Sequence, residues 1–167
     1  GSVNEIIYYA AYGSNLNKQQ MYGRCPMAKP ISKAVLNGWK LVFRGVADIV
    51  PCSDAQVNLG IYSITPECET ALDHYESYPN LYIKKHIPIQ LKRSQITSMF
   101  YVMKPGYGFG SPSEKYFRTI REGYENWKLP EKLLLKSMHH AQIHDGGEAY
   151  KSRYWNTVDT GDENDKI

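Results

Sequence analysis

Apolar residues in this chain follow strand-like and helix-like patterns, and the clearest of them stands near the N-terminus. Residues 6–12 form an apolar and aromatic run without a polar face, which predicts a short interior strand covered on both sides. The run stops in the small, polar turn Gly13-Ser14-Asn15, where Ser14 or Asn15 suits the N-cap of a following helix. Taken alone, this turn is either a simple connection or, through its exposed N–H groups, a place for a carboxylate or an oxyanion.

Five further segments are rich in β-branched and aromatic residues and predict more strands. They are residues 34–43, 47–51, 57–64, 81–91 and 96–103. Gly38 marks a bend or bulge in the first of them, and a loop is expected around Ser53 and Asp54. The last two should form a hairpin, in which Pro88 restricts its strand to an edge position or a bulge.

Helical patterns alternate with these strands. Thr65 as N-cap and Pro66 at the first helical position mark a helix that should run to about Tyr75. Its apolar face ends just before Glu76, so this carboxylate should reach the edge of the core. The other helices expected are residues 17–22, a helix capped by Ser111 or Ser113 that runs to Trp127, and one that starts at residues 129–131.

Length and charge define the classes of protein that this chain can belong to. A single domain is expected over residues 3–156, followed by an acidic, disordered tail at residues 157–167. The formal net charge is +3, and lysines and arginines are scattered without a dense run. This distribution disfavours a nucleic-acid partner and is compatible with a small anionic substrate.

Cysteine usage and hydropathy bear on location. Cys25, Cys52 and Cys68 are an odd set without a CxxC pair, no secretory leader is apparent, and no apolar run reaches membrane-spanning length. We therefore expect a cytoplasmic protein in a reducing compartment, without a membrane partner.

Two other segments resemble functional sites, but the residues around them argue against those functions. Residues 106–110 are rich in glycine but lack the Lys-Ser/Thr ending and the strand-to-helix context of a phosphate-binding loop, so we expect a lid or connector. His140 and His144 are four residues apart, but no acidic partner has the spacing of a zinc protease. They are interpreted as structural or surface histidines, and no metal site is predicted.

Three segments together resemble the gamma-glutamylcyclotransferase-like (AIG2-like) family. Residues 12–16 match the Tyr-Gly-Ser-Asn-Leu loop of that family, and residues 72–76 resemble its Leu-Asp-x-x-Glu-Gly element. Residues 112–116, with Gly123 and Leu129-Pro130 downstream, make the third match. The order and spacing agree over about residues 5–136. One departure is Ser77, which stands where the family usually has glycine and leaves the local backbone angle and the substrate preference open.

The resemblance implies an α+β fold, a small mixed β-barrel flanked by helices, with a pocket at the mouth of the barrel. It also implies an enzyme, with the chemistry of an acyltransferase or lyase, that releases 5-oxoproline from a γ-glutamyl amide. The α-amine of the substrate attacks its own γ-carbonyl, and the attached amino acid, peptide or amine leaves. No metal and no cofactor is needed for this reaction.

Site residues follow from the same resemblance and from the chemistry of proton transfer. Glu76 is the candidate general base and acid, because the attacking nitrogen must lose a proton and the leaving nitrogen must gain one. Burial beside tyrosines would raise its pKa toward the useful range. The predicted substrate-binding residues are Tyr12, Gly13, Ser14, Asn15, Leu16, Tyr101 and Tyr116. Tyr101 and Tyr116 are alternatively core rings with satisfied hydroxyls.

A different class of function stays open at this point. The same pocket could hold a small anionic metabolite without turnover, in which case the protein would be a binding protein. A carboxylate in the pocket argues against that alternative, because a binder of anions gains nothing from it. The leaving group, the oligomeric state and the biological source do not follow from the sequence.

Overall fold

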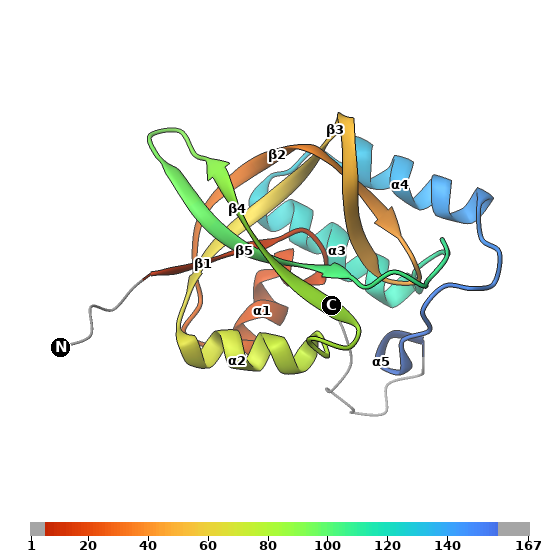
Figure 1. Ribbon diagram of the computed structural model, residues 1–167, viewed down its shortest axis with the longest axis horizontal. Coiled ribbons are helices and arrows are strands. Elements are labelled where there is room, and N and C mark those ends of the chain that lie inside the picture. The colour runs from red at the N-terminus through yellow and green to blue at the C-terminus, as the bar shows by residue number, and fades with distance from the viewer. Residues whose placement is uncertain (1–5, 157–167) are drawn as a thin grey trace.

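A five-stranded sheet with β1 (Ile7–Ala11) at its centre organises the computed structural model, which describes residues 6–156 (Figure 1). The order of strands is β2-β3-β1-β5-β4, with the bounds β2 Lys29–Phe43, β3 Ala47–Ile64, β4 Tyr82–Gln90 and β5 Gln95–Met103. β1 pairs antiparallel with β3 and parallel with β5. The prediction of an interior strand is therefore confirmed.

The long ribbon of β2 and β3 corrects one prediction. β3 runs without a break from Ala47 to Ile64, where a loop around Ser53 and Asp54 was expected between two strands. The loop was expected because Ser53 and Asp54 are polar. Both residues nevertheless remain in the strand, where their side chains face solvent at an irregular point of the ladder. There the pairing with β2 jumps from Trp39–Pro51 to Asn37–Gln56, opposite Gly38. Gly38 has a positive φ of 85°, so the predicted bulge at this glycine is confirmed.

The fold class is α+β, as predicted, but the sheet is not a closed barrel. β2 and β4 stand at opposite ends of the strand order and do not pair with each other within residues 6–156. β4 and β5 form the predicted hairpin, and Pro88 lies on β4, an edge strand of the sheet, as predicted. Each end of the sheet thus has its own edge strand.

Helices flank this sheet on several sides (Figure 1). Their bounds are η1 Ser14–Leu16, α1 Lys18–Arg24, α2 Pro66–Tyr75, α3 Glu114–Trp127, α4 Lys132–Ile143 and α5 Arg153–Asn156. Thr65 caps α2 and Ser113 caps α3 through their side-chain oxygens, as expected. The cap of α1 is Asn17 and not Ser14 or Asn15, because the latter two belong to the short 3₁₀ turn η1.

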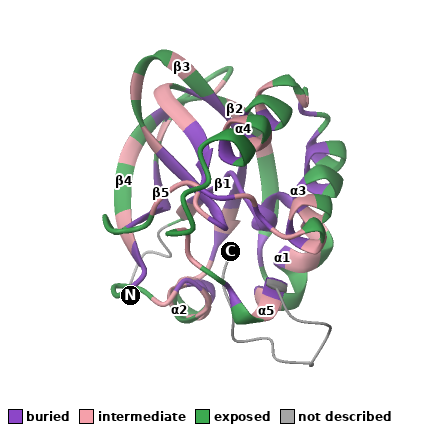
Figure 2. Cartoon of the chain, turned by 90° about the vertical axis from the view of Figure 1, so that its right-hand side faces the viewer, coloured by how far each residue is buried: buried purple, intermediate pink, exposed green. Residues whose placement is uncertain are grey.

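Large aromatic side chains fill the interior, and most of them are tyrosines. The most deeply buried side chains include Tyr9, Tyr12, Tyr62, Tyr82, Tyr101, Tyr116 and Tyr124. A buried hydroxyl needs a hydrogen-bond partner, and those of Tyr12, Tyr62, Tyr82 and Tyr101 donate to groups on other elements or loops. Figure 2 shows the buried positions gathered on the inner faces of the strands and helices, with exposed residues on the outside.

Cys25 and Cys68 are joined by a disulfide that the sequence analysis did not predict. The pairing links the end of α1 to the first turns of α2 across 43 residues, and sequence spacing gives no sign of it. Cys52 is a free, partly exposed thiol. Between residues 6 and 156, no helix is both long enough and apolar enough to cross a bilayer. The predicted acidic tail lies outside the described residues.

Candidate active site

Glu76 lies at the C-terminal end of α2, and its side chain is completely buried. Its backbone N–H donates to the carbonyl oxygen of Leu72 at 2.8 Å, which continues the helical ladder to this residue. The buried face of α2 carries Cys68 and Leu72, and the same face delivers Glu76 into the interior. The carboxylate is thus deeper than the core edge at which the sequence places it.

The chain reverses directly after Glu76 without the glycine that is usual in the family. Ser77 has a φ of 49°, in the left-handed region that side chains disfavour. Its carbonyl oxygen accepts hydrogen bonds from the N–H groups of Asn80 at 2.8 Å and Leu81 at 2.9 Å. These bonds hold a serine in the conformation that glycine adopts more easily.

Tyrosines surround the buried carboxylate. Burial raises the pKa of Tyr9, Tyr12, Tyr101 and Tyr116, and the nearby charge of Glu76 raises it further in each case. All four phenols are therefore neutral at physiological pH and can donate hydrogen bonds. Glu76 thus has four neutral, buried phenols near it, and the buried carboxylate of Asp48 also lies near Tyr12. We call Tyr9, Tyr12, Tyr101 and Tyr116 the tyrosine cage.

The hydroxyl groups of all four tyrosines have hydrogen-bond partners. Tyr12 donates to the carbonyl oxygen of Tyr101 at 2.6 Å, and Tyr101 donates to Oδ1 of Asp73 at 2.6 Å. The Tyr116 oxygen accepts the N–H of Ala47 at 2.9 Å, which leaves its own proton able to donate. Tyr12 and Tyr101 therefore hold the structure together, whereas Tyr116 has a donor to spare.

The Gly13-Ser14-Asn15 turn reaches the same cage through Tyr9. Nδ2 of Asn15 donates to the hydroxyl oxygen of Tyr9 at 3.1 Å, and the carbonyl oxygen of Asn15 accepts the hydroxyl of Tyr62 at 2.8 Å. Ser14 and Asn15 are completely buried. Tyr9 thus connects the turn to the surroundings of Glu76, a link that the sequence analysis did not identify.

Leu16, the last residue of the predicted loop, is held by contacts with α3. Its carbonyl oxygen accepts the indole N–H of Trp127 at 2.8 Å. Its side chain is fully buried against Gly60 and Gly123. Leu16 therefore anchors the turn against α3, and its part in substrate binding stays a prediction.

Gln20 and Arg24 of α1 complete the site, although sequence analysis assigned them no role. Nε2 of Gln20 donates to Oγ of Ser14 at 2.7 Å, and Nη1 of Arg24 donates to Oδ1 of Asn15 at 3.2 Å. Burial raises the pKa of Tyr9 and Tyr116, and the Arg24 guanidinium opposes part of that rise, so its charge reaches the cage. The four-residue spacing on one helix face is the signal that could have paired these two residues.

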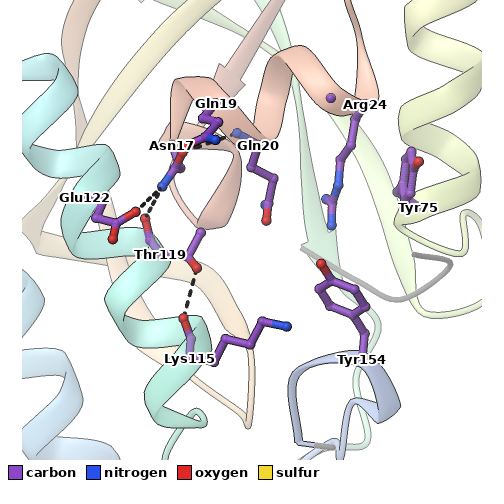
Figure 3. Close-up of a pocket in the computed structure, with 10 residues that line it drawn as sticks. Asn17, Gln19, Gln20, Arg24, Tyr75, Lys115, Thr119, Glu122 and Tyr154 are labelled. Atoms are coloured by element: carbon purple, nitrogen blue, oxygen red, sulfur yellow. Dashed lines mark hydrogen bonds between the residues drawn. The ribbon is translucent and has the colours of Figure 1, made fainter. Parts of the chain in front are cut away.

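A cavity of about 540 Å³ opens beside these two side chains. Figure 3 shows Gln20, Arg24, Lys115 and Tyr154 directed toward a common space, with Tyr75 at its side. None of the eight predicted site residues lines this cavity, although Gln20 and Arg24, which do line it, bond to Ser14 and Asn15. The cavity therefore adjoins the tyrosine cage and is separate from it.

The short helix α5 covers the remaining side. The indole ring of Trp155 packs edge-on against the ring of Tyr116, with centroids 5.0 Å apart, and Trp155 is 3% exposed. Nζ of Lys115 lies 4.7 Å from the ring centroid of Tyr154. These contacts seal the outer face of Tyr116. They join residues about 40 positions apart, so the sequence pattern carries no sign of them.

Histidines do not take part in this site. The rings of His140 and His144 stack with centroids 4.2 Å apart at the end of α4. Burial lowers the pKa of His140, and the neighbouring His144 and Lys40 add to that effect. Within residues 6–156, no group of three or more His, Cys, Asp or Glu side chains is arranged as a metal site.

Comparison with known proteins gives this arrangement a family. The family described as "Gamma-glutamyl cyclotransferase, AIG2-like" matches residues 9–129, which is most of the chain and contains both Glu76 and the Tyr12–Leu16 segment. The chain belongs to this family. No curated protein sequence matches the chain.

Several solved structures share the fold of this chain. A structure titled gamma-glutamyl cyclotransferase superposes with a TM-score of 0.72 at 22% identity, covering 94% of this chain and 95% of the other. An uncharacterized human protein gives a TM-score of 0.70 at 22% identity with the same coverage. YkqA from Bacillus subtilis gives 0.69 at 20% identity, covering 82% of this chain and 54% of that one. At these identities the likeness establishes the gamma-glutamyl cyclotransferase fold.

Proposed function

We propose that this family member is a γ-glutamylcyclotransferase-type enzyme that releases 5-oxoproline from a γ-glutamyl amide. The observation that carries the proposal is the complete burial of Glu76 in a cage of neutral tyrosines, one of which is hydrogen-bonded to Asn15 of the family loop. Burial of a carboxylate costs free energy, so the position of Glu76 calls for a compensating role. Proton transfer in a water-poor site provides a reason for this cost.

Glu76 moves the proton in the proposed reaction. The α-ammonium group of the substrate first loses a proton and becomes a nucleophilic amine. As the new C–N bond forms at the γ-carbonyl, Glu76 takes a second proton from the attacking nitrogen. It returns that proton to the departing nitrogen as the original C–N bond breaks. The expelled amine regains the first proton from solvent, so the charges balance without a metal or a cofactor.

The turn and the tyrosine cage would bind the charges of the substrate. Backbone N–H groups of Gly13, Ser14 and Asn15 are donors for the substrate carboxylate or for the oxyanion that develops at the γ-carbonyl. The spare proton of the Tyr116 hydroxyl is a further donor at the same site. We assign Tyr12 and Tyr101 to the walls of the cage, because both of their hydroxyls are already engaged.

The leaving group would occupy the cavity beyond Gln20 and Arg24. This cavity, at about 540 Å³, is large enough for an amino acid, a dipeptide or a polyamine. It adjoins the cage at Asn15, the residue that accepts a hydrogen bond from Arg24. The position of the cavity supports a γ-glutamyl substrate whose reacting end lies with Glu76 and whose amine lies outside the cage.

The test is formation of 5-oxoproline, measured by mass spectrometry, from γ-glutamyl amino acids, γ-glutamyl amines and glutathione. Wild type should release product from at least one of them, and Glu76→Gln should be slower by about 100-fold or more. Glu67→Gln, an exposed carboxylate on the same helix, is the matched control and should retain full activity. Equal turnover by Glu76→Gln and wild type would overturn the mechanism.

A binding protein is the alternative class, and the same experiment separates it. If neither protein forms product while a γ-glutamyl compound still raises the melting temperature of both, the pocket binds without turnover. The buried Glu76 favours the enzyme, because a carboxylate in that position repels an anionic ligand unless it exchanges protons with it.

A further inference from the structure

A second cavity, of about 770 Å³, lies between α4 and the β2–β3 ribbon. It shares no lining residue with the cavity beside Arg24. In Figure 1, α4 lies at the upper right against β2 and β3, while α1 and α2 lie at the bottom. We call this space the α4 cavity. It is independent of Glu76 and of the proposed cyclotransferase reaction.

Positive charge predominates on the wall of the α4 cavity. Lys40 comes from β2, and Lys132 and Lys136 come from α4, whereas Asp54 is the one acidic residue among those that line it. Burial and the neighbouring His144 lower the pKa of His140, and the Lys40 charge lowers it further. His140 therefore lies close enough to Lys40 to be affected by its charge. The wall therefore attracts anions.

The buried floor of the cavity holds a hydrogen-bond donor that lacks an acceptor. Asn58 of β3 lines the cavity and is 5% exposed. Its Nδ2 atom is buried and has no hydrogen-bond partner among residues 6–156. A buried amide N–H₂ without an acceptor is costly and calls for an explanation, and an oxygen atom of a ligand would supply the missing acceptor.

Apolar side chains form the remaining wall. Leu41 of β2, Leu133 of α4 and Pro130 just before α4 also line the cavity. Ser137 does not compete for a ligand, because its hydroxyl donates to the carbonyl oxygen of Leu41 at 2.9 Å and ties α4 to β2. The cavity thus combines cations, one unpartnered amide donor and an apolar surface.

We propose that the α4 cavity binds a small organic anion with an apolar body. Its carboxylate or phosphate group pairs with the lysines, an oxygen atom accepts a hydrogen bond from Nδ2 of Asn58, and the body lies on Leu41 and Leu133. An inorganic anion would pair with the lysines but would make no contact with the apolar side chains. A neutral apolar molecule would contact Leu41 and Leu133 but would not pair with the lysines. Nothing in this assignment involves Glu76 or the turn at Ser14.

The side-chain amide signals of Asn58 report directly on this site in a ¹H–¹⁵N NMR spectrum. The uniformly labelled chain would be titrated with phenyl phosphate, benzoate and inorganic phosphate at constant ionic strength. We expect a saturable shift of the Asn58 side-chain signals with phenyl phosphate or benzoate below about 10 mM, and weaker binding of inorganic phosphate. The tighter of the two organic anions identifies the charged group that the site accepts.

Variants make the assignment specific. Lys136→Gln should weaken binding by about tenfold, because one charge is lost from the wall. Lys92→Gln, in the β4–β5 turn, removes the same charge elsewhere on the surface and should leave binding unchanged. Asn58→Leu should abolish binding while backbone signals remote from the cavity stay in place. If no anion shifts the Asn58 signals saturably, or if Lys136→Gln binds as wild type does, the proposal is wrong.

Discussion

The indole N–H of Trp127 donates to the carbonyl oxygen of Leu16 at 2.8 Å, so the last turn of α3 holds the end of the family loop. This contact is possible because the helix and the loop approach closely at Gly123. A Cβ atom at Gly123 would lie 2.6 Å from the backbone nitrogen of Asn17 and 2.7 Å from the carbonyl carbon of Leu16. The loop is therefore positioned by backbone contact, which no side chain at residue 123 permits.

Replacement of Gly123 by alanine should force α3 and the loop apart. We expect Gly123→Ala to lower the free energy of unfolding by about 1–3 kcal/mol and to lower kcat/KM, because the loop that holds Asn15 shifts. Unfolding in urea and the 5-oxoproline assay measure the two effects. Gly23→Ala in α1 is the matched control for stability, since among the described residues no atom beyond its chain neighbours and its own helix backbone lies within 4 Å of its Cβ position. This variant should be neutral or gain up to about 1 kcal/mol.

A second prediction concerns Ser77, which adopts the left-handed backbone conformation although it carries a side chain. Ser77→Gly should raise the free energy of unfolding by about 1 kcal/mol, since glycine adopts this conformation without the steric cost. Lys128 has a φ of 54° at the C-cap of α3, so Lys128→Gly tests the same effect away from Glu76. Activity of Ser77→Gly should stay near that of wild type. A loss of stability in Ser77→Gly would show that the serine side chain, and not the backbone, governs this turn.

Tyr101 links the hairpin to α2 just before Glu76. Its hydroxyl donates to Asp73, which also forms an ion pair with Lys84 at 2.9 Å. Burial lowers the pKa of Lys84, but hydrogen bonds to Glu69 and Asp73 outweigh this effect, so the net shift is upward. Tyr101→Phe should therefore cost about 1–3 kcal/mol of stability, because a charged acceptor loses its donor.

The matched control for Tyr101→Phe is Tyr107→Phe, which removes a hydroxyl from a ring that is 37% exposed. Chemical denaturation should show no measurable change for this control. In the activity assay, Tyr101→Phe should lower kcat more than it raises KM. Loss of the hydrogen bond from the Tyr101 hydroxyl to Asp73 loosens the segment that carries Glu76. A Tyr101→Phe protein as stable and as active as wild type would show that Asp73 is held by Lys84 alone.

The parts of the structure that were predictable depend on local chemistry. The caps Thr65 and Ser113 act on N–H groups three residues away, and Pro88 restricts its strand through its own missing N–H. By contrast, the contact of Trp155 with Tyr116 and the disulfide between Cys25 and Cys68 join residues far apart in the sequence. No hydrophobic periodicity indicates that these residues meet. Such contacts are decided by tertiary packing, which a single sequence does not display.

The candidate site shows the same division. Glu76 and the turn at Ser14 were identified because their segments resemble the family motifs, and the apolar face of α2 indicated burial. Arg24 has no motif of its own, and its approach to Asn15 depends on how α1 packs against the turn. The sheet is open where a closed barrel was predicted. A sequence pattern indicates how many strands form, but it does not show whether the two edge strands pair with each other.

A last prediction concerns Asp48, whose carboxylate is buried inside the sheet. Its Oδ1 atom accepts the N–H groups of Ile49 and Met103, both at 2.9 Å, and Oδ2 accepts Nε of Arg44 at 3.2 Å. Burial raises the pKa of Asp48, and these hydrogen bonds only partly oppose the rise. The folded state therefore holds the proton to higher pH than the unfolded state does.

Because the pKa of Asp48 is raised on folding, its contribution to stability is complete below the unfolded pKa of about 4 and is lost as the pH rises through the folded value. In Asp48→Asn, the amide oxygen keeps both backbone hydrogen bonds but has no proton to lose. The free energy of unfolding of wild type minus that of Asp48→Asn should therefore fall as the pH is raised from about 3 to 7. Urea unfolding across this range measures it, with the exposed Asp54→Asn as control. A difference that is constant, or that rises with pH, would mean that the bonds to Arg44 and the backbone dominate over burial.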